Sequence, residues 1–192
     1  MMVKGVEKPM ARLPYLEKKD LAPEHQDLMK REISLYKQLA HSPGALRAFQ
    51  GLGYYIRYKS PVDARLRELA ILQVGYLARS PYEWSHHVKI GYDFGVTDDD
   101  IKAMIDDTEG RPAKLDKLIG LVLKGAREIT TGGEMTRATF AALREHLSNE
   151  HLVDLIVTTS FYNAVVRVLG SLEIDVEPEY QKYLDKFPLP KK

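Results

Sequence analysis

Residues 65–95 read RLRELAILQVGYLARSPYEWSHHVKIGYDFG, and this stretch predicts the centre of the fold. From Leu69 to Ala78 nearly every side chain is apolar, so the helix that these residues form should run through the interior of the protein. Ser80 and Pro81 then begin a second helix, because serine is favoured at the N-cap and proline at the first helical position. The very short joint predicts that the two helices are antiparallel neighbours.

The rest of the chain also predicts helices. Ser-Pro pairs at 42–43 and 60–61 repeat the helix-start signal, and Thr97 followed by three aspartates is a further N-terminus. Apolar residues recur at helical spacing in four more segments, which are 29–39, 46–56, 115–129 and 140–147. Proline is absent between Pro112 and Pro178, so we expect long helices there, with breaks at Gly132-Gly133 and Ser148. Together these patterns predict an all-α fold, a compact bundle of about six to eight helices.

The most apolar long stretch runs from Leu152 to Leu172. Its β-branched first half could form a buried strand, but its length and the lack of a partner strand favour a helix. Asp154, Asn163 and Arg167 would be costly in lipid, so we interpret this segment as a buried helix and predict no membrane span.

Composition limits the class of protein. The 192 residues suit one domain, 1–192, in which the proline-spotted and charged ends at 1–20 and 174–192 are expected to form arms. A net charge of +1 provides no field that would attract nucleic acid or an anionic membrane. The N-terminus has no apolar region typical of a secretory signal, so we expect a cytoplasmic location. With no cysteine, the sequence excludes disulfides, thiolate metal ligands and thiol chemistry.

Three residues in the opening stretch are candidates for catalysis. Glu68 lies at the start of the apolar helix, where a desolvated carboxylate either finds a partner or has its pKa raised, as acid–base catalysis requires. Glu83 and His87 are four residues apart, so their Cβ atoms should lie roughly 5–6 Å apart on one helix face. Ser80 and Glu83 also form a capping-box pattern, which is a purely structural alternative for Glu83. His86 should point about 100° away from His87.

These residues, together with Tyr82-Glu83-Trp84 and His86-His87, resemble the carboxymuconolactone decarboxylase family, whose superfamily includes the alkylhydroperoxidase D proteins. In the thiol branch of that superfamily, a Glu is followed by a Cys-x-x-Cys pair and a His. The Glu and His of that pattern fall on Glu68 and His87, whereas the two cysteine positions fall on Ser80 and Glu83. The sequence therefore resembles the cysteine-free branch. The resemblance implies an all-helical, alkylhydroperoxidase D-like fold and a homo-oligomer, a trimer or hexamer.

The first functional hypothesis is a decarboxylase-like lyase that performs acid–base chemistry on a small carboxylated or lactone substrate and needs no cofactor. In this hypothesis His87 transfers the proton, Glu68 orients His87, and Glu83 is a second acid or base. Residues expected to contact substrate or line its pocket are Ser80, Tyr82, Trp84 and His86. Arg167 could hold a substrate carboxylate, or could instead pair with an acid such as Asp154 or Glu173.

Three alternatives remain at this stage. Glu68, Glu83 and His87 could bind a divalent metal ion, although no His-Glu-x-x-His motif occurs and no metal site is our prediction. The protein could be a non-catalytic oligomeric binding protein, with Tyr54, Tyr55 and Tyr58 lining a pocket or an interface. A peroxidase or peroxiredoxin activity of the superfamily type is disfavoured, because it requires cysteine.

Overall fold

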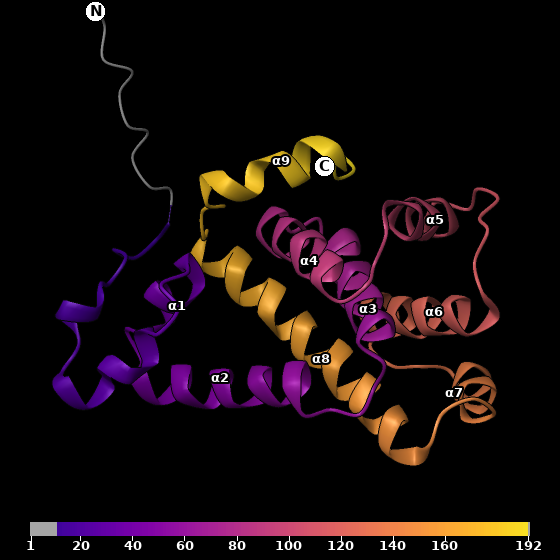
Figure 1. Cartoon of the computed structure of the whole chain (residues 1–192), viewed down its shortest axis with the longest axis horizontal. Coiled ribbons are helices and arrows are strands. Elements are labelled where there is room, and N and C mark those ends of the chain that lie inside the picture. Colours follow the sequence, from indigo (N-terminus) through magenta and orange to yellow (C-terminus); the bar gives the residue numbers. More distant parts are fainter. Residues whose placement is uncertain (1–10, 192) are drawn as a thin grey trace, which may run out of the picture.

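The computed structural model describes residues 11–191 and is all-α, with no strand in that range (Figure 1). Its α-helices are α1 (Ser34–Leu39), α2 (Pro43–Tyr58), α3 (Ala64–Leu77), α4 (Pro81–Asp93), α5 (Asp98–Thr108), α6 (Lys117–Gly132), α7 (Arg137–Arg144), α8 (Asn149–Leu172) and α9 (Gln181–Lys186). Three short 3₁₀ helices are η1 (Lys18–Asp20), η2 (Pro23–Met29) and η3 (Pro178–Tyr180). The all-α prediction is confirmed. The first ten residues of the expected N-terminal arm lie outside the described range.

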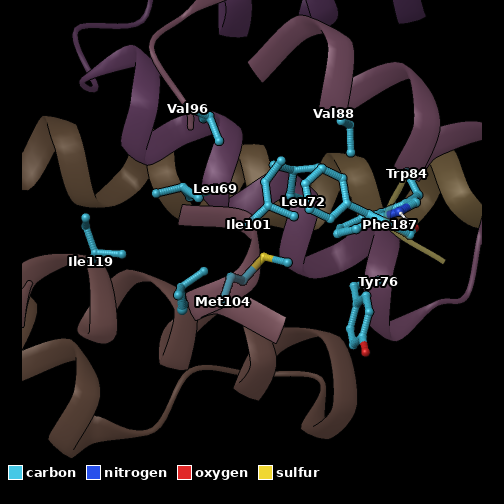
Figure 2. Packing of buried hydrophobic residues seen from close by; sticks show 11 residues of the cluster. Leu69, Leu72, Tyr76, Trp84, Val88, Val96, Ile101, Met104, Ile119 and Phe187 are labelled. Carbon is cyan, nitrogen blue, oxygen red and sulfur yellow. Dashed lines mark hydrogen bonds between the residues drawn. The ribbon is translucent and has the colours of Figure 1, made fainter. Parts of the chain in front are cut away.

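Helix α3 is the central element of the fold, as predicted. It packs against α4, α6 and α8, which surround it in Figure 1. Figure 2 shows Leu69 and Leu72 of α3 packed with Trp84 of α4 and with Ile101 and Met104 of α5. All five side chains are completely buried. Because residues 67–76 of α3 are all buried, a polar residue in that part of the helix must find its partner inside the protein.

The starts of two helices agree with the Ser-Pro signal, and one does not. Helices α2 and α4 begin at Pro43 and Pro81 as predicted, but α3 begins at Ala64 and not after Ser60-Pro61. Asp63 is the N-cap, and its carboxylate accepts a hydrogen bond from the Leu66 backbone N–H at 3.0 Å. The carboxylate of aspartate caps a helix as well as a serine hydroxyl does, and this cap defines the start of α3.

The apolar pattern at 29–39 does not form one helix. The 3₁₀ helix η2 ends at Met29, and α1 begins only at Ser34. The break at Gly133 is confirmed, since this residue ends α6 with a φ of 88°, a left-handed conformation that favours glycine. Ser148 also caps α8 as predicted, with its side chain accepting from the His151 backbone N–H at 3.2 Å.

Helix α8 is long and apolar enough to cross a membrane by length and composition alone. A core helix of a globular protein passes the same test. Within the structure, 56% of its most apolar window is buried, and it packs against α3 and α6. The segment is therefore helical, as predicted, and forms part of the core.

The C-terminal arm is more structured than the sequence predicts. It contains α9, which adds one helix to the expected six to eight and packs against α4. The Trp84 indole N–H donates to the Phe187 carbonyl oxygen at 2.7 Å, and the Phe187 ring is buried in the core cluster of Figure 2. This arrangement holds the C-terminal segment against the helix that carries Glu83 and His87.

Candidate active site

The structure brings the three predicted catalytic residues into one series of contacts. The Nδ1 atom of His87 lies 2.7 Å from Glu68 Oε2, and its Nε2 atom lies 3.0 Å from Glu83 Oε1. Glu68 comes from α3 and the other two residues from α4, which packs against it. Residue exposure is 0% for Glu68, 3% for Glu83 and 4% for His87. Both nitrogens of one imidazole are thus directed at buried carboxyl groups.

Glu68 is the ionised end of this series. Burial raises the pKa of its carboxyl group, but His87, Arg67 and Arg57 together outweigh burial and lower it. Arg67 donates from Nη2 to Glu68 Oε1 at 3.1 Å, so the carboxylate is paired in the interior. An ionised Glu68 accepts the Nδ1–H of His87, which leaves the Nε2 atom of His87 directed at Glu83.

Glu83 is the opposite end, and its carboxyl group has the reverse tendency. Burial raises the pKa of Glu83, and the nearby charge of Glu68 raises it further, against lowering effects of His87 and Arg57. The Oε1 atom of Glu83 is buried without a hydrogen-bond partner, because its approach to His87 Nε2 lacks hydrogen-bond geometry. Environment therefore separates the two glutamates into one that favours the charge and one that favours the proton.

The capping-box interpretation of Glu83 is wrong. Ser80 is the N-cap of α4, but its side chain makes no capping hydrogen bond. The Glu83 side chain lies beside His87 and next to Gly75 of α3, where an added Cβ would come within 3.5 Å of Glu83 Cγ. The carboxyl group of Glu83 is thus available for a role other than capping the start of α4.

A cavity of about 250 Å³ opens beside Glu83 and His87. Its walls come from η2, α1, α2, α4 and α8, and the aromatic side chains among them include Tyr36, Phe49, Tyr58, Tyr82, Phe161 and Tyr162. Glu68 does not line this cavity. A small, largely apolar molecule in the cavity would therefore meet Glu83 and His87 directly, and Glu68 only through His87.

His86 also lines the cavity, but it is held on both faces and at its edge. Its ring stacks between Tyr82 and Tyr180, with centroid distances of 4.1 and 3.6 Å. Its Nε2 atom lies 2.7 Å from a carboxylate oxygen of Glu177, and the Tyr82 hydroxyl donates to the other oxygen at 3.1 Å. Glu177 lies in the C-terminal arm and was missed in the sequence, because nothing in its local pattern indicates that the arm folds back.

Glu177 makes the stability of this wall depend on pH. Burial raises its pKa, but hydrogen bonds from His86 and from the Ser34 backbone N–H, at 2.8 Å, outweigh burial and lower the pKa from 4.5 to about 2. Such a carboxylate stabilises the fold fully above pH 4.5, and this contribution is lost as the pH falls from there towards 2. We expect up to about 3 kcal/mol of acid destabilisation from this residue.

Urea unfolding of wild type and Glu177→Gln at pH 7 and pH 3 tests this expectation. The variant should lose stability at pH 7 and show a smaller drop between the two pH values than wild type does. The buried His86, whose pKa is lowered chiefly by desolvation, adds an acid destabilisation of the same sign below its ordinary pKa in both proteins. Equal drops in wild type and variant would contradict the assignment to Glu177.

Two predicted substrate-contact residues do not reach the cavity. Trp84 is completely buried in the core cluster, where its N–H is used by Phe187. Ser80 is buried at the start of α4 and is not part of the cavity lining. Tyr82 and His86, the other two candidates, do line it.

Arg167 is also absent from the lining. It is exposed on α8 and donates from Nη1 to the Asn163 carbonyl and side-chain oxygens at 2.5 and 3.0 Å. The alternative ion pairs are not formed in the described part of the chain, since Asp154 accepts from a tyrosine and Glu173 pairs with Arg12. Arg167 faces outward because the opposite face of α8 packs against the core.

The cation that does line the cavity is Arg57 on α2. Its Nε atom is buried and has no hydrogen-bond partner. Tyr54 and Tyr58, one turn apart on the same helix, line the cavity as well, with ring centroids 5.1 Å apart. Tyr55 instead points elsewhere and donates to Asp154 at 3.0 Å. An arginine within the tyrosine cluster YYIRY was the available sequence signal for this position.

The alternative in which Glu68, Glu83 and His87 bind a metal ion finds no support in the structure. Over residues 11–191, no group of three or more histidine, aspartate and glutamate side chains has an arrangement that would hold a metal ion. Glu68, Glu83 and His87 are close together, but the two imidazole nitrogens are already directed at the two carboxyl groups. A metal ion would have to displace these contacts.

Comparison with known proteins agrees with the sequence resemblance. Residues 43–110, which span α2 to α5 and hold Glu68, Glu83 and His87, match the model of the carboxymuconolactone decarboxylase family. No curated protein matches the sequence.

Several solved structures share the fold across nearly the whole chain. An uncharacterized peroxidase-related protein from Ralstonia eutropha, described as an alkylhydroperoxidase AhpD core, is 21% identical with a TM-score of 0.73, covering 96% of this chain and 100% of that one. A peroxidase-related protein from Silicibacter sp. is 19% identical with a TM-score of 0.72, covering 94% and 97%. The debrominase Bmp8, as a cysteine-to-alanine variant in complex with 2,3,4-tribromopyrrole, is 17% identical with a TM-score of 0.75, covering 93% and 99%. These similarities confirm the predicted alkylhydroperoxidase D-like fold.

Proposed function

Since residues 43–110 of this chain match the carboxymuconolactone decarboxylase family, on an alkylhydroperoxidase D-like fold, we propose that the protein is an acid–base enzyme of this kind. Its reaction is the decarboxylation, or a related proton transfer, of a small carboxylated or lactone substrate. The observation that supports the proposal is the buried Glu68–His87–Glu83 series, which ends in a carboxyl group on the wall of a cavity of about 250 Å³.

The series supplies the proton that such a reaction needs. When a carboxylate leaves as CO₂, its bonding electron pair stays on the substrate carbon as a carbanion or enolate, which must be protonated. Glu83 favours its protonated form because it is buried, so it is the donor to that carbon. His87, whose Nε2 atom lies 3.0 Å from Glu83 Oε1, then passes a proton from solvent to the Glu83 carboxylate.

Glu68 acts through His87 and is a positioning residue. It does not line the cavity, and its contact with His87 Nδ1 fixes the tautomer and the orientation of the ring. Its ionised carboxylate also stabilises the imidazolium that exists briefly while His87 carries a second proton.

Other chemistry on this fold is less well supported for this chain. Thiol peroxidases need a thiolate that attacks the peroxide and a second sulfur that resolves the product, and the 192 residues contain no cysteine. A purely binding protein would have no need for two buried carboxyl groups on opposite nitrogens of one imidazole, of which one favours the proton and the other the charge.

The proposal is tested with a panel of small lactones and unsaturated carboxylates in D₂O, with CO₂ release and deuterium incorporation as readouts. Wild type should act on at least one of them, and Glu83→Gln should be slower by about 100-fold or more, because the amide cannot donate a carboxylic proton. Activity should decline as the pH rises through the raised pKa of Glu83. The control is Glu134→Gln, an exposed glutamate outside the cavity lining. A panel without any turnover, or full activity in Glu83→Gln, would contradict the proposal.

A further inference from the structure

Arg57 is a partly buried cation on the cavity wall, and no ion pair within residues 11–191 involves it. Its Nε atom is shielded from solvent and lacks a hydrogen-bond partner. Burial lowers its pKa, but Tyr162 and Glu68 outweigh burial and raise it, so the guanidinium keeps its charge. A buried donor that has no hydrogen-bond partner costs free energy, and the Nε atom of Arg57 is such a donor. A ligand with an acceptor oxygen in the cavity would supply the missing partner of this donor.

The acidic groups near the cavity are already accounted for. Glu68 is paired with Arg67 at 3.1 Å and bonded to His87, and burial raises the pKa of Glu83 and so favours its neutral form. Asp27 at the cavity rim accepts two hydrogen bonds of 2.9 Å from an exposed arginine. The ionised Glu177 lies behind His86 and does not line the cavity. With Glu83 protonated, the one charge that the described residues place on the inner wall of the cavity is therefore the positive charge of Arg57.

The rim of the cavity has the same sign. Lys30 and Arg31 follow η2, line the cavity and are exposed, and neither forms an ion pair in the described part of the chain. Exposed cations at the entrance of a cavity raise the local concentration of anions. The charge at the entrance and the charge in the interior thus both favour a negatively charged ligand.

The walls indicate the shape of this ligand. Phe49 and Phe161 form a tilted pair with ring centroids 4.7 Å apart, and Tyr162 makes an edge contact with the His87 ring at 4.9 Å. These rings line the same cavity as Arg57. A flat, unsaturated or aromatic body packs favourably between such rings.

From this charge and shape we propose that Arg57 binds the carboxylate of the substrate, and that the substrate class is planar monocarboxylates. This inference rests on the proposed function, because it places the substrate in the cavity that Glu83 and His87 share. The planar guanidinium donates two parallel hydrogen bonds to the carboxylate. The carbon that bears this carboxylate then faces Glu83, which protonates it once CO₂ has left, and the unsaturated body packs between the aromatic walls.

Benzoate and its neutral analogue benzamide test the proposal by isothermal titration calorimetry on the full chain. Wild type should bind benzoate more tightly than benzamide. Arg57→Gln should weaken the binding of benzoate about 10-fold or more and leave the affinity for benzamide unchanged. The benzoate affinity of Arg57→Lys should lie between those of wild type and Arg57→Gln. Unchanged benzamide binding also demonstrates that the variant is folded. The matched control is Arg137→Gln, which replaces an exposed arginine on α7. This variant should bind both ligands with the affinity of wild type.

Several results would overturn the inference. Wild type could fail to bind benzoate, or it could bind benzoate no more tightly than benzamide. A preference for benzoate that persists in Arg57→Gln would also contradict the inference. Because the readout is binding without turnover, it separates the two proposals. An Arg57-dependent preference in a protein that turns over no substrate keeps the anion site and removes the acid–base function. Glu83-dependent turnover without that preference removes the anion site alone.

Discussion

Replacing His87 with alanine is expected to reduce turnover by about 10³- to 10⁴-fold, the largest effect on activity that the structure predicts. His87 contacts both the ionised Glu68 and the proton-bearing Glu83, with atoms 2.7 Å from one and 3.0 Å from the other. Without the imidazole, Glu83 loses the neighbouring group that returns its proton after each turnover. The measurements are kcat and kcat/KM, together with far-UV circular dichroism as a check of helicity.

Two additions make the His87 experiment specific. Imidazole in solution should restore part of the activity of His87→Ala, because the substitution vacates a ring-sized space on the cavity wall. The control is His146→Ala, an exposed histidine after α7, which should retain full activity. If His87→Ala keeps its helicity and turns over at the wild-type rate, the role of the series in proton transfer is wrong.

Replacing Glu68 with leucine is expected to lower the free energy of unfolding by about 3–5 kcal/mol, the largest effect on stability. The substitution leaves Arg67 buried without its carboxylate, and a buried uncompensated charge is strongly destabilising. It also removes the acceptor of the His87 Nδ1–H. Urea unfolding followed by circular dichroism measures the loss.

A double variant separates the stability role of Glu68 from its role in the site. In Arg67→Met, Glu68→Leu both buried charges are gone, so much of the stability should return. Activity should not return, because His87 still lacks the partner that orients it. Arg12→Met, which breaks an exposed pair with Glu173, is the control and should cost about 1 kcal/mol or less. A fully active double variant would show that Glu68 serves the fold alone.

The helical architecture could be predicted because its signals are local. The wholly apolar face of α3 and the proline at the start of α4 specify two adjacent helices without reference to the remainder of the chain. The prediction of one helix over 29–39 was wrong because that segment depends on tertiary contacts. Its apolar spacing suits a helix, but in the folded protein η2 ends at Met29 and α1 begins only at Ser34. Trimer or hexamer assembly, a small-molecule partner and a cytoplasmic location stay predictions.

Within the site, the sequence by itself determined the pairing of Glu83 with His87. Their four-residue spacing fixes a shared helix face by backbone geometry, and the absence of cysteine excluded thiol chemistry. Glu68 followed from the antiparallel neighbour helix, because a buried glutamate on α3 needed a partner on α4.

Only the tertiary structure decided which other side chains reach the cavity. It placed Arg57 on the wall and left Arg167 on the surface, although each is an arginine in a largely apolar helix. It also brought Glu177 to His86 across 91 residues of sequence. The physical reason is that a helix face is fixed by its own periodicity, whereas the meeting of distant helices depends on the packing of the whole core.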